Sequence, residues 1–117
     1  MSAVAEHVVS DQVVTKLNEQ FPHTSLVAQS TVDSITTLWL ERSELKAIVS
    51  YIKSIGFEML FDLCGVDERV RQDRSGLPES DFTVVYHFFS FSQLLDLRLK
   101  VALQGSDPNL PTIQDIY

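Results

Sequence analysis

Residues 95–103 alternate strictly between apolar and polar side chains, and this pattern constrains the fold more than any other feature of the sequence. Every odd position from Leu95 to Leu103 is apolar, whereas Asp96, Arg98 and Lys100 occupy even positions. Successive side chains of a β-strand point to opposite faces of its sheet. The spacing therefore predicts a strand with one buried face and one face that contacts solvent or a partner.

The other segments predict four more strands and two helices. Runs of apolar and β-branched residues predict strands at residues 25–31, 35–40, 57–64 and 82–91. Short connections join the first two strands and the last two, so each of these pairs is expected to form a hairpin. The helical spacing of apolar side chains predicts helices at residues 10–21 and 43–56, the second capped by Ser43 and ended by Gly56.

The order of these elements, α-β-β-α-β-β-β, is typical of an α+β fold. Two helices are expected to pack on a mainly antiparallel sheet of about five strands. Residues 110–117 predict the start of a third helix at the C-terminus, with Pro111 in its first turn. The chain has 117 residues, 44% hydrophobic and 21% charged, which is typical of one globular domain. We expect residues 1–9 to form a flexible lead-in and residues 10–117 to form a single α+β domain.

The distribution of charge and hydrophobicity excludes two classes of direct partner. The formal net charge is −7, and the basic side chains are interspersed with acidic ones. A protein that binds nucleic acid needs a basic patch for the phosphates, so no nucleic-acid partner is expected. No apolar run approaches the roughly 20 residues that span a bilayer. Any association with a membrane should therefore be indirect, through a partner.

Cys64 and His87 are the candidate catalytic residues of the chain. Cys64 is the only cysteine, which excludes an intramolecular disulfide and a cysteine-based zinc or iron–sulfur site within this chain. Nothing in the sequence marks the helix N-terminus that would activate it, so we predict that Cys64 is a small buried hydrophobic residue. His87 lies between Tyr86 and Phe88, and we interpret it as a hydrogen-bonded residue of the core or of an interface. The histidines show no metal-ligand spacing and no glycine-rich phosphate loop is present, so no metal or cofactor site is expected.

The connection between the third and fourth predicted strands is much longer than a hairpin turn. Its charged residues alternate in sign and include Asp67, Glu68, Arg69, Arg71 and Arg74. Such alternation is typical of a solvated surface whose charges pair with one another. The middle of the loop, however, carries Gly76, Leu77 and Pro78, which place an apolar side chain on a rigid backbone and could anchor a partner. The residues alone leave a docking loop and a plain surface loop equally open.

Three motifs in this region resemble one protein family. They are residues 62–71 (DLCGVDERVR), 74–78 (RSGLP) and 81–90 (DFTVVYHFFS), supported by the shorter stretches at 38–39 (LW), 99–103 (LKVAL) and 110–112 (LPT). In consistent order from about Phe21 to Tyr117, they resemble the C subunit of bacterial NADH:quinone oxidoreductase, or respiratory complex I. The Gly-Leu-Pro form of the loop is similar to the variety in which this subunit is fused to the D subunit, which forms the quinone site.

Two features depart from the family pattern. Cys64 stands where this variety is expected to have histidine or a small residue, which weakens a chemical role for that position. The family also continues beyond the helix that begins near Pro111 with a motif of the type Asn-Trp-Tyr-Glu-Arg-Glu. Tyr117 precedes that motif. We therefore expect the chain to be an N-terminal part of the family sequence, truncated at its C-terminus.

The resemblance implies a non-catalytic subunit domain of the hydrophilic, or peripheral, arm of a proton-translocating NADH:quinone oxidoreductase. Such a domain would support electron transfer from NADH to quinone by scaffolding the cluster- and quinone-binding subunits. NADH, FMN, the iron–sulfur clusters and quinone would then belong to partner subunits, and none to this chain. The implied partners are chiefly the D subunit, fused or separate, and neighbouring iron–sulfur subunits. The implied location is peripheral, on the cytoplasmic side of the bacterial inner membrane.

The resemblance also makes the charged loop an expected subunit interface. The residues expected there are Asp67, Glu68, Arg69, Arg71, Arg74, Gly76, Leu77 and Pro78, together with Asp96, Arg98 and Lys100 on the polar face of residues 95–103. Two other interpretations remain open. One is a stand-alone acidic α+β protein-interaction module, and the other is a small enzyme that uses Cys64 or His87.

Overall fold

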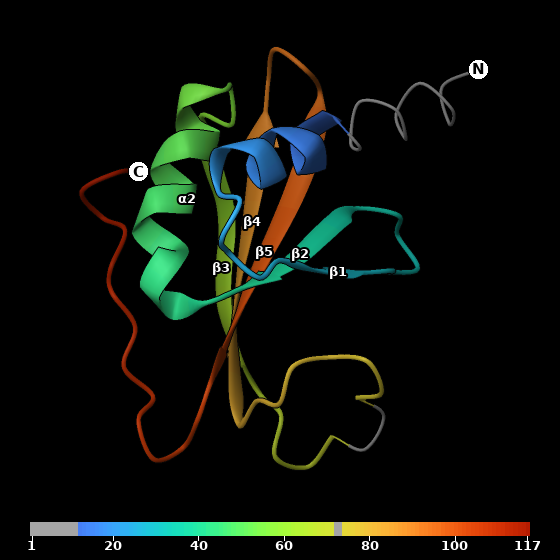
Figure 1. The fold of residues 1–117 in the computed structure, drawn as a ribbon, viewed down its shortest axis with the longest axis vertical. Helices are drawn as coiled ribbons and strands as arrows, with labels where there is room; N and C mark the ends of the chain where they lie inside the picture. Colours follow the sequence, from blue (N-terminus) through green and yellow to red (C-terminus); the bar gives the residue numbers. More distant parts are fainter. Residues whose placement is uncertain (1–11, 72–73) are drawn as a thin grey trace.

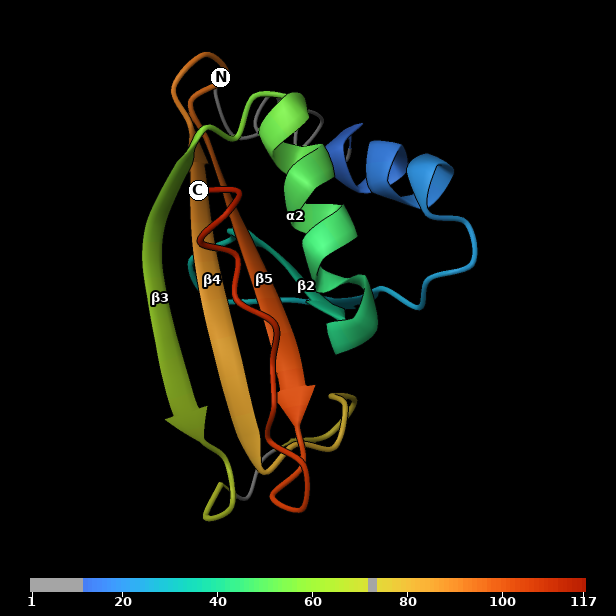
Figure 2. The same ribbon diagram turned by 90° about the vertical axis from the view of Figure 1, so that its left-hand side faces the viewer.

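The computed structural model describes residues 12–71 and 74–117, so the expected lead-in at residues 1–9 lies outside the described residues. Five strands form one sheet in the order β1-β2-β5-β4-β3. Their bounds are β1 Val27–Gln29, β2 Thr36–Leu40, β3 Met59–Asp67, β4 Phe82–Ser90 and β5 Leu95–Leu103. A helix at residues 12–20 and helix α2 (Leu45–Ser54) cover one face of this sheet (Figures 1 and 2). The predicted α+β class is therefore confirmed.

Strand β5 lies at the centre of the sheet and shows the burial that its alternating sequence predicts. Its odd-numbered side chains, from Leu95 to Leu103, are all buried. β5 pairs antiparallel with β4 along its whole length and parallel with β2, and the other pairs are antiparallel. The sheet is thus mainly antiparallel, with one parallel pair between strands that lie far apart in the sequence.

The core forms between the buried face of the sheet and the two helices. The helix at residues 12–20 contributes Val13 and Leu17, and α2 contributes Leu45, Ile48, Val49 and Ile52. These side chains pack against Phe88 and the odd positions of β5. Each fully buried aliphatic or aromatic side chain contributes about 1.5–3 kcal/mol through the hydrophobic effect. The opposite face of the sheet carries no helix in the described residues, and it holds the candidate interface.

Gly56 ends helix α2 as the sequence predicts. Its φ is +110°, a conformation that disfavours side chains, and its N–H donates to Lys53 O at 3.2 Å. The N–H of Phe57 donates to Ile52 O at 3.0 Å. These two hydrogen bonds form a Schellman motif, which satisfies carbonyls at the end of the helix.

We expect Gly56→Ala to destabilise the chain by about 1–2 kcal/mol, because a Cβ is disfavoured at this φ. The added Cβ would also lie 2.7 Å from Nε2 of Gln93, which donates to Ile55 O. Urea unfolding measures the effect. Gly65→Ala is the matched control, because a Cβ there meets nothing within 4 Å. Equal stability of the two variants would contradict the prediction.

Two details differ from the sequence prediction. Ser43 does not cap a helix: a 3-10 turn at Arg42–Glu44 precedes α2, and no side chain caps either element. Arg42 holds this turn instead, since it donates to the carbonyls of Asp107 and Asn109. The expected start of a third helix is only a turn, in which the N–H groups of Ile116 and Tyr117 donate to Ile113 O. One turn makes too few hydrogen bonds to offset the entropy of ordering a helix.

Candidate protein interface

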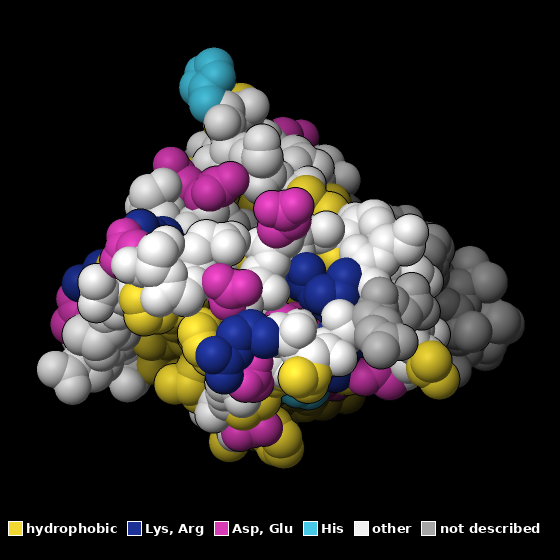
Figure 3. All heavy atoms as spheres, turned by 90° about the horizontal axis from the view of Figure 1, so that it is seen from below, with side chains coloured by type: hydrophobic (Ala, Val, Ile, Leu, Met, Phe, Trp, Pro, Cys, Tyr) yellow, Lys and Arg dark blue, Asp and Glu magenta, His cyan; other side chains and the backbone are white. Residues whose placement is uncertain are grey.

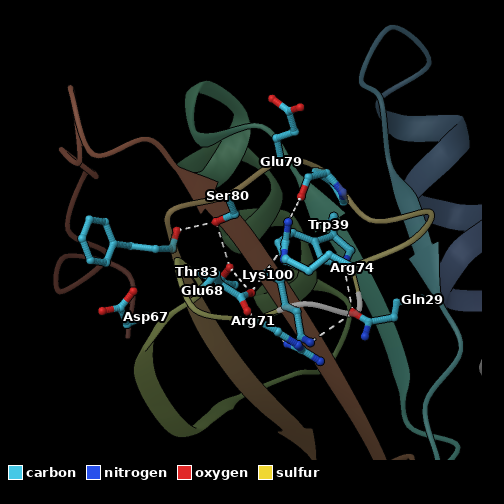
Figure 4. A network of polar contacts seen from close by, with 12 residues as sticks. Gln29, Trp39, Asp67, Glu68, Arg71, Arg74, Glu79, Ser80, Thr83 and Lys100 are labelled. Atoms are coloured by element: carbon cyan, nitrogen blue, oxygen red, sulfur yellow. Dashed lines mark hydrogen bonds and ion pairs between the residues drawn. The ribbon is translucent and has the colours of Figure 1, made fainter.

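The charged loop after β3 folds back onto the sheet around Glu68, whose side chain is only 2% exposed. Thr83 Oγ1 donates to Glu68 Oε2 at 2.6 Å, and Arg71 Nη1 donates to Oε1 at 3.1 Å. Arg74 Nη2 forms an ion pair with Oε2 at 3.5 Å. Figure 4 shows these side chains converging on the carboxylate from the loop and from β4. The loop is therefore built around a buried ionic centre.

Arg74 fixes the middle of the loop to the sheet. Its Nη1 donates to Pro78 O at 2.7 Å, and its guanidinium lies 5.7 Å from the centre of the Trp39 ring. In the part of the chain that the structure describes, Nε and Nη2 of Arg74 are buried without a hydrogen-bond partner. The attraction between Arg74 and Glu68 is therefore mainly Coulombic, and it is strengthened by the low local dielectric.

Trp39 joins the three strands beneath the loop. Its Nε1 donates to Gln29 Oε1 at 2.8 Å, and the same oxygen accepts from Lys100 Nζ at 3.0 Å. The ammonium of Lys100 also lies 5.3 Å from the centre of the Trp39 ring. Trp39 is 2% exposed, although it lies on the face of the sheet without helices. The loop and these polar contacts replace a helix as its cover.

The charges of this centre have shifted pKa values with identifiable causes. Burial raises the pKa of Glu68, but hydrogen bonds from Thr83 and Arg71 and the charge of Arg74 outweigh it, so the net pKa is lowered. Burial is the main cause of the lowered pKa of Lys100, and repulsion from neighbouring arginines adds to it. Glu68 therefore remains ionised at neutral pH, as the counterion of the arginines.

Asp67 and Arg69 form an exposed pair at the start of the loop. Arg69 Nη2 donates to Asp67 Oδ2 at 2.8 Å, and hydrogen bonds from Arg69 lower the pKa of Asp67 to about 2. The guanidinium of Arg69 also lies 4.8 Å from the centre of the Phe82 ring. This pair is accessible to a partner, unlike Glu68.

The polar positions of β5 pair with neighbouring elements. Asp96 Oδ1 lies 2.7 Å from His87 Nε2, and Arg98 Nη2 donates to Asp33 Oδ2 at 2.7 Å. Hydrogen bonds, the largest from Arg98, hold the pKa of Asp33 well below its usual range. His87 is hydrogen-bonded, as expected, and its ring lies 5.3 Å from that of Phe61. The predicted interface residues of β5 thus lie on one face with their polar groups already paired.

The prediction that Cys64 is buried is wrong, because Cys64 is exposed. Strand β3 is an edge strand, so its side chains have neighbours only on the β4 side. Across the pair, Cys64 lies opposite Val85 and His87 lies opposite Asp62. Among the described residues no hydrogen bond joins Cys64 to a base, which a nucleophilic cysteine requires.

Strand β3 exposes several large apolar side chains that sequence reasoning did not assign to the interface. Met59 is 37% exposed, Phe61 63%, Leu63 51% and Val66 38%. The only signal in the sequence was the apolar character of the run, which an edge strand shares with a buried one. Figure 3 shows that, at the loop end of the molecule, apolar side chains lie among acidic and basic ones.

A groove of about 440 Å³ lies between the loop and the adjoining strands. Its lining residues come from β1, β2, the end of β5 and the loop, and include Val27, Trp39, Glu41, Leu77, Pro78, Glu79, Ala102 and Gln104. Two parts of the loop that the sequence singled out, Leu77 and Pro78, thus form one of its walls. The groove joins segments that are distant in the sequence.

The part of the chain that the structure describes contains neither a membrane-crossing helix nor a cluster of metal ligands. Within residues 12–71 and 74–117, no helix has the length and apolar character needed to cross a bilayer. In the same ranges, no group of three or more His, Cys, Asp or Glu side chains could hold a metal ion.

The family described as "Respiratory-chain NADH dehydrogenase, 30 Kd subunit" matches residues 38–117, which include the last three residues of β2, both sides of the charged loop and β5. This chain belongs to that family. The resemblance inferred from the sequence motifs is thereby confirmed.

The sequence is similar to fused subunits of this kind. It is 42% identical over 111 residues to the C/D subunit of NADH-quinone oxidoreductase from Proteus mirabilis, a match covering 93% of this chain and 19% of that protein. It is 43% identical over 107 residues to the C/D subunit from Psychrobacter arcticus, covering 90% of this chain and 18% of that protein. The chain therefore spans about a fifth of the length of these curated relatives.

Solved structures share the fold at lower identity. A trypsin-resistant fragment (1-134) of Nqo5 superimposes with a TM-score of 0.73 at 22% identity, covering 92% of this chain and 80% of the fragment. A chain of the membrane-bound sulfane sulfur reductase, an archaeal respiratory membrane complex, superimposes with a TM-score of 0.67 at 16% identity, covering 92% of this chain and 58% of that chain. At these identities the likeness shows the fold alone.

Proposed function

We propose that this chain is a non-catalytic domain of the hydrophilic arm of a proton-translocating NADH:quinone oxidoreductase. It scaffolds the cluster- and quinone-binding subunits, which hold NADH, FMN, the iron–sulfur clusters and quinone. Its partners are a quinone-site D subunit, as the fused C/D relatives suggest, and neighbouring iron–sulfur subunits. It is peripheral to the cytoplasmic side of the bacterial inner membrane. Membership of the 30 kDa subunit family supports this proposal over a stand-alone module or a small enzyme.

The observation that carries the scaffolding role is the exposed apolar edge strand. An edge strand presents unpaired N–H and C=O groups, and proteins usually protect it with lysine, proline or a covering element. β3 contains no Lys, Arg or Pro, and its protection is limited to Asp62, Asp67 and a register shift between Leu60 and Asp62. In the described residues it pairs only with β4. Phe61 and Leu63 are both more than half exposed. Large apolar side chains that are exposed together on an edge strand favour a covering partner.

The charged loop supplies the second part of the proposed interface. Arg69 and Arg71 reach the surface with side chains 60% and 45% exposed, and we propose that they contact partner subunits with Leu77 and Pro78. Glu68 and Arg74 are internal, and they support this surface by shaping the loop. Asp96 and Arg98 extend the proposed interface on the face of the sheet without helices, and Lys100 supports it from beneath the loop through Gln29 and Trp39. The loop thus acts through its rigid shape and not through catalysis.

We expect Phe61→Asp, introduced into the native gene, to reduce the assembled complex by at least about tenfold, because a buried interface position does not tolerate an unpaired charge. Native gels of source-cell membranes, stained for NADH dehydrogenase activity and blotted for this chain, measure assembly. Phe61→Leu should assemble normally, because it keeps an apolar side chain.

Ser50→Asp is the matched control for added charge. Ser50 is exposed on helix α2, away from β3 and the charged loop, so this variant should assemble like the wild type. Unchanged assembly of a correctly folded Phe61→Asp protein would contradict the proposed scaffolding surface. A chain that never co-migrates with NADH dehydrogenase activity would contradict the proposed function as a whole.

A further inference from the structure

We infer that the groove beside Leu77 and Pro78 binds a segment of a partner polypeptide that inserts one apolar side chain flanked by lysine or arginine. This inference rests on the proposed role of the chain as a subunit domain. It adds the chemistry of the partner segment, which the family relationship does not specify. The shape, the charge and the rigidity of the groove each support it.

The shape of the groove suits an apolar side chain. Val27 and Ala102 line it on the sheet side, Leu77 and Pro78 line it on the loop side, and Trp39 lies between them. A volume of about 440 Å³ is within the range of sites that bury a ligand of side-chain size or larger. Burying an apolar residue here would remove the remaining exposed surface of the partly buried Leu77 and Pro78 from water.

The charged side chains that line the groove are all acidic. Glu41 and Glu79 line it and are exposed, and no lysine or arginine of the described residues lines it. Among the described residues, neither carboxylate takes part in an ion pair, in contrast to the paired acids of the loop. Figure 4 shows the side chain of Glu79 pointing away from the network around Glu68. A partner segment that carries lysine or arginine would therefore complement the charge of these two carboxylates.

Two basic side chains, Arg74 and Lys100, pack beneath the groove. They do not neutralise Glu41 and Glu79, because each of them contacts other groups. Arg74 pairs with Glu68 and lies against the ring of Trp39. Lys100 donates to Gln29 and also lies against that ring. Both cations face the buried centre of the loop, so the groove itself keeps its negative rim.

The wall of the groove is fixed before any partner binds. Arg74 Nη1 donates to Pro78 O at 2.7 Å, and Gln104 Nε2 donates to Glu79 O at 3.0 Å. The N–H of Leu77 donates to Arg74 O at 3.1 Å. These bonds hold three consecutive residues of the wall. A preformed wall lowers the entropy that binding must offset, which favours a specific docking groove.

The test uses the assembled complex in detergent-solubilised membranes, with the chain in its native setting. The variants are Glu41→Gln/Glu79→Gln, which removes the negative rim, and Leu77→Ala, which removes part of the apolar wall. The control is Glu19→Gln on the exposed face of the first helix, outside the groove. Native gels at rising salt concentration measure how much complex stays assembled. In parallel, carbodiimide cross-linking followed by mass spectrometry identifies the amines that contact Glu41 and Glu79.

We expect the double glutamine variant to dissociate at lower salt, with about three- to tenfold more free chain at intermediate salt. Leu77→Ala should raise the free fraction about tenfold at all salt concentrations, because its contribution is apolar. In the wild type, cross-links should join Glu41 or Glu79 to a lysine of another part of the complex. The Glu19→Gln control should behave like the wild type.

Three outcomes would overturn the inference. One is salt dissociation of the double glutamine variant identical to that of the wild type, with both carboxylates as reactive as Glu19 toward an added amine. A second is a cross-link from the groove to another copy of this chain. The third is absence of the chain from the complex, which would overturn the proposed function as well and is therefore distinguishable from the other two.

Discussion

Replacing Glu68 with alanine is expected to lower the free energy of unfolding by about 3 kcal/mol, because the change leaves the arginines around a buried site without their counterion. Arg74 is the more affected, since its side chain is 15% exposed and its Nε and Nη2 have no hydrogen-bond partner among the described residues. Thr83 also loses the acceptor of a 2.6 Å hydrogen bond. Urea unfolding of the chain measures the loss.

Asp67→Ala is the matched control, because it removes the neighbouring acid, which also pairs with an arginine of the loop. The Asp67–Arg69 pair is exposed, with side chains 47% and 60% accessible. Exposed ion pairs contribute about 0–1 kcal/mol. Equal destabilisation of the two variants would mean that Glu68 is not the centre of the loop.

The pH dependence of the same site gives an independent test. The pKa of Glu68 is lowered by folding, so its stabilisation is fully present above its unfolded pKa of about 4.3 and is lost as the pH falls through the folded pKa. The stability difference between the wild type and Glu68→Gln should thus be largest near neutral pH and should shrink below about pH 4. A constant difference from pH 7 to pH 3 would contradict the assignment.

Local sequence patterns predicted the parts of the fold that are determined by residues close to one another in the sequence. The alternation from Leu95 to Leu103 specified which face of β5 is buried, since a strand reverses its side chain at each residue. Gly56 marked the end of α2 because its φ of +110° suits glycine. Both features are set within a few residues of the chain, where sequence is most informative.

Features that depend on distant residues could not be predicted in this way. The parallel pairing of β2 with β5 joins segments separated by α2, β3 and β4, and no local pattern specifies it. Cys64 was expected to be buried because an apolar edge strand and an apolar central strand have the same composition. Burial depends on the strand order, which the sequence does not display.

In the candidate interface, too, the sequence did not show which charged residues are buried. The alternating charges of the loop predicted a solvated surface or a docking surface, but Glu68 is buried whereas Asp67 beside it is exposed. Which acid turns inward depends on Thr83, which β4 supplies from the far side of the loop. The groove likewise brings together Glu41 and Glu79, which lie far apart in the sequence and line it from separate parts of the chain. Family motifs predicted that the loop is an interface but not which side chains shape it.

Trp39→Ala is expected to cost about 3–5 kcal/mol, because it opens a cavity beneath the loop as well as removing buried apolar surface. Trp39 is 2% exposed and lies against both Arg74 and Lys100. Its loss would expose these cations to a void and remove one of the two donors to Gln29 Oε1. The damage should therefore reach the loop as well as the strand that carries Trp39.

Two measurements separate these effects. Urea unfolding gives the total loss, and amide hydrogen exchange of Leu77, whose N–H donates to Arg74 O, reports the loop. Trp39→Phe is the control: it keeps an aromatic ring for the cations but loses the indole N–H, so it should cost about 1–2 kcal/mol. Protection of Leu77 should fall in the alanine variant more than in the phenylalanine variant. A Trp39→Ala protein with wild-type exchange at Leu77 would show that the sheet does not hold the loop, and the groove would then lack the fixed wall on which its specificity depends.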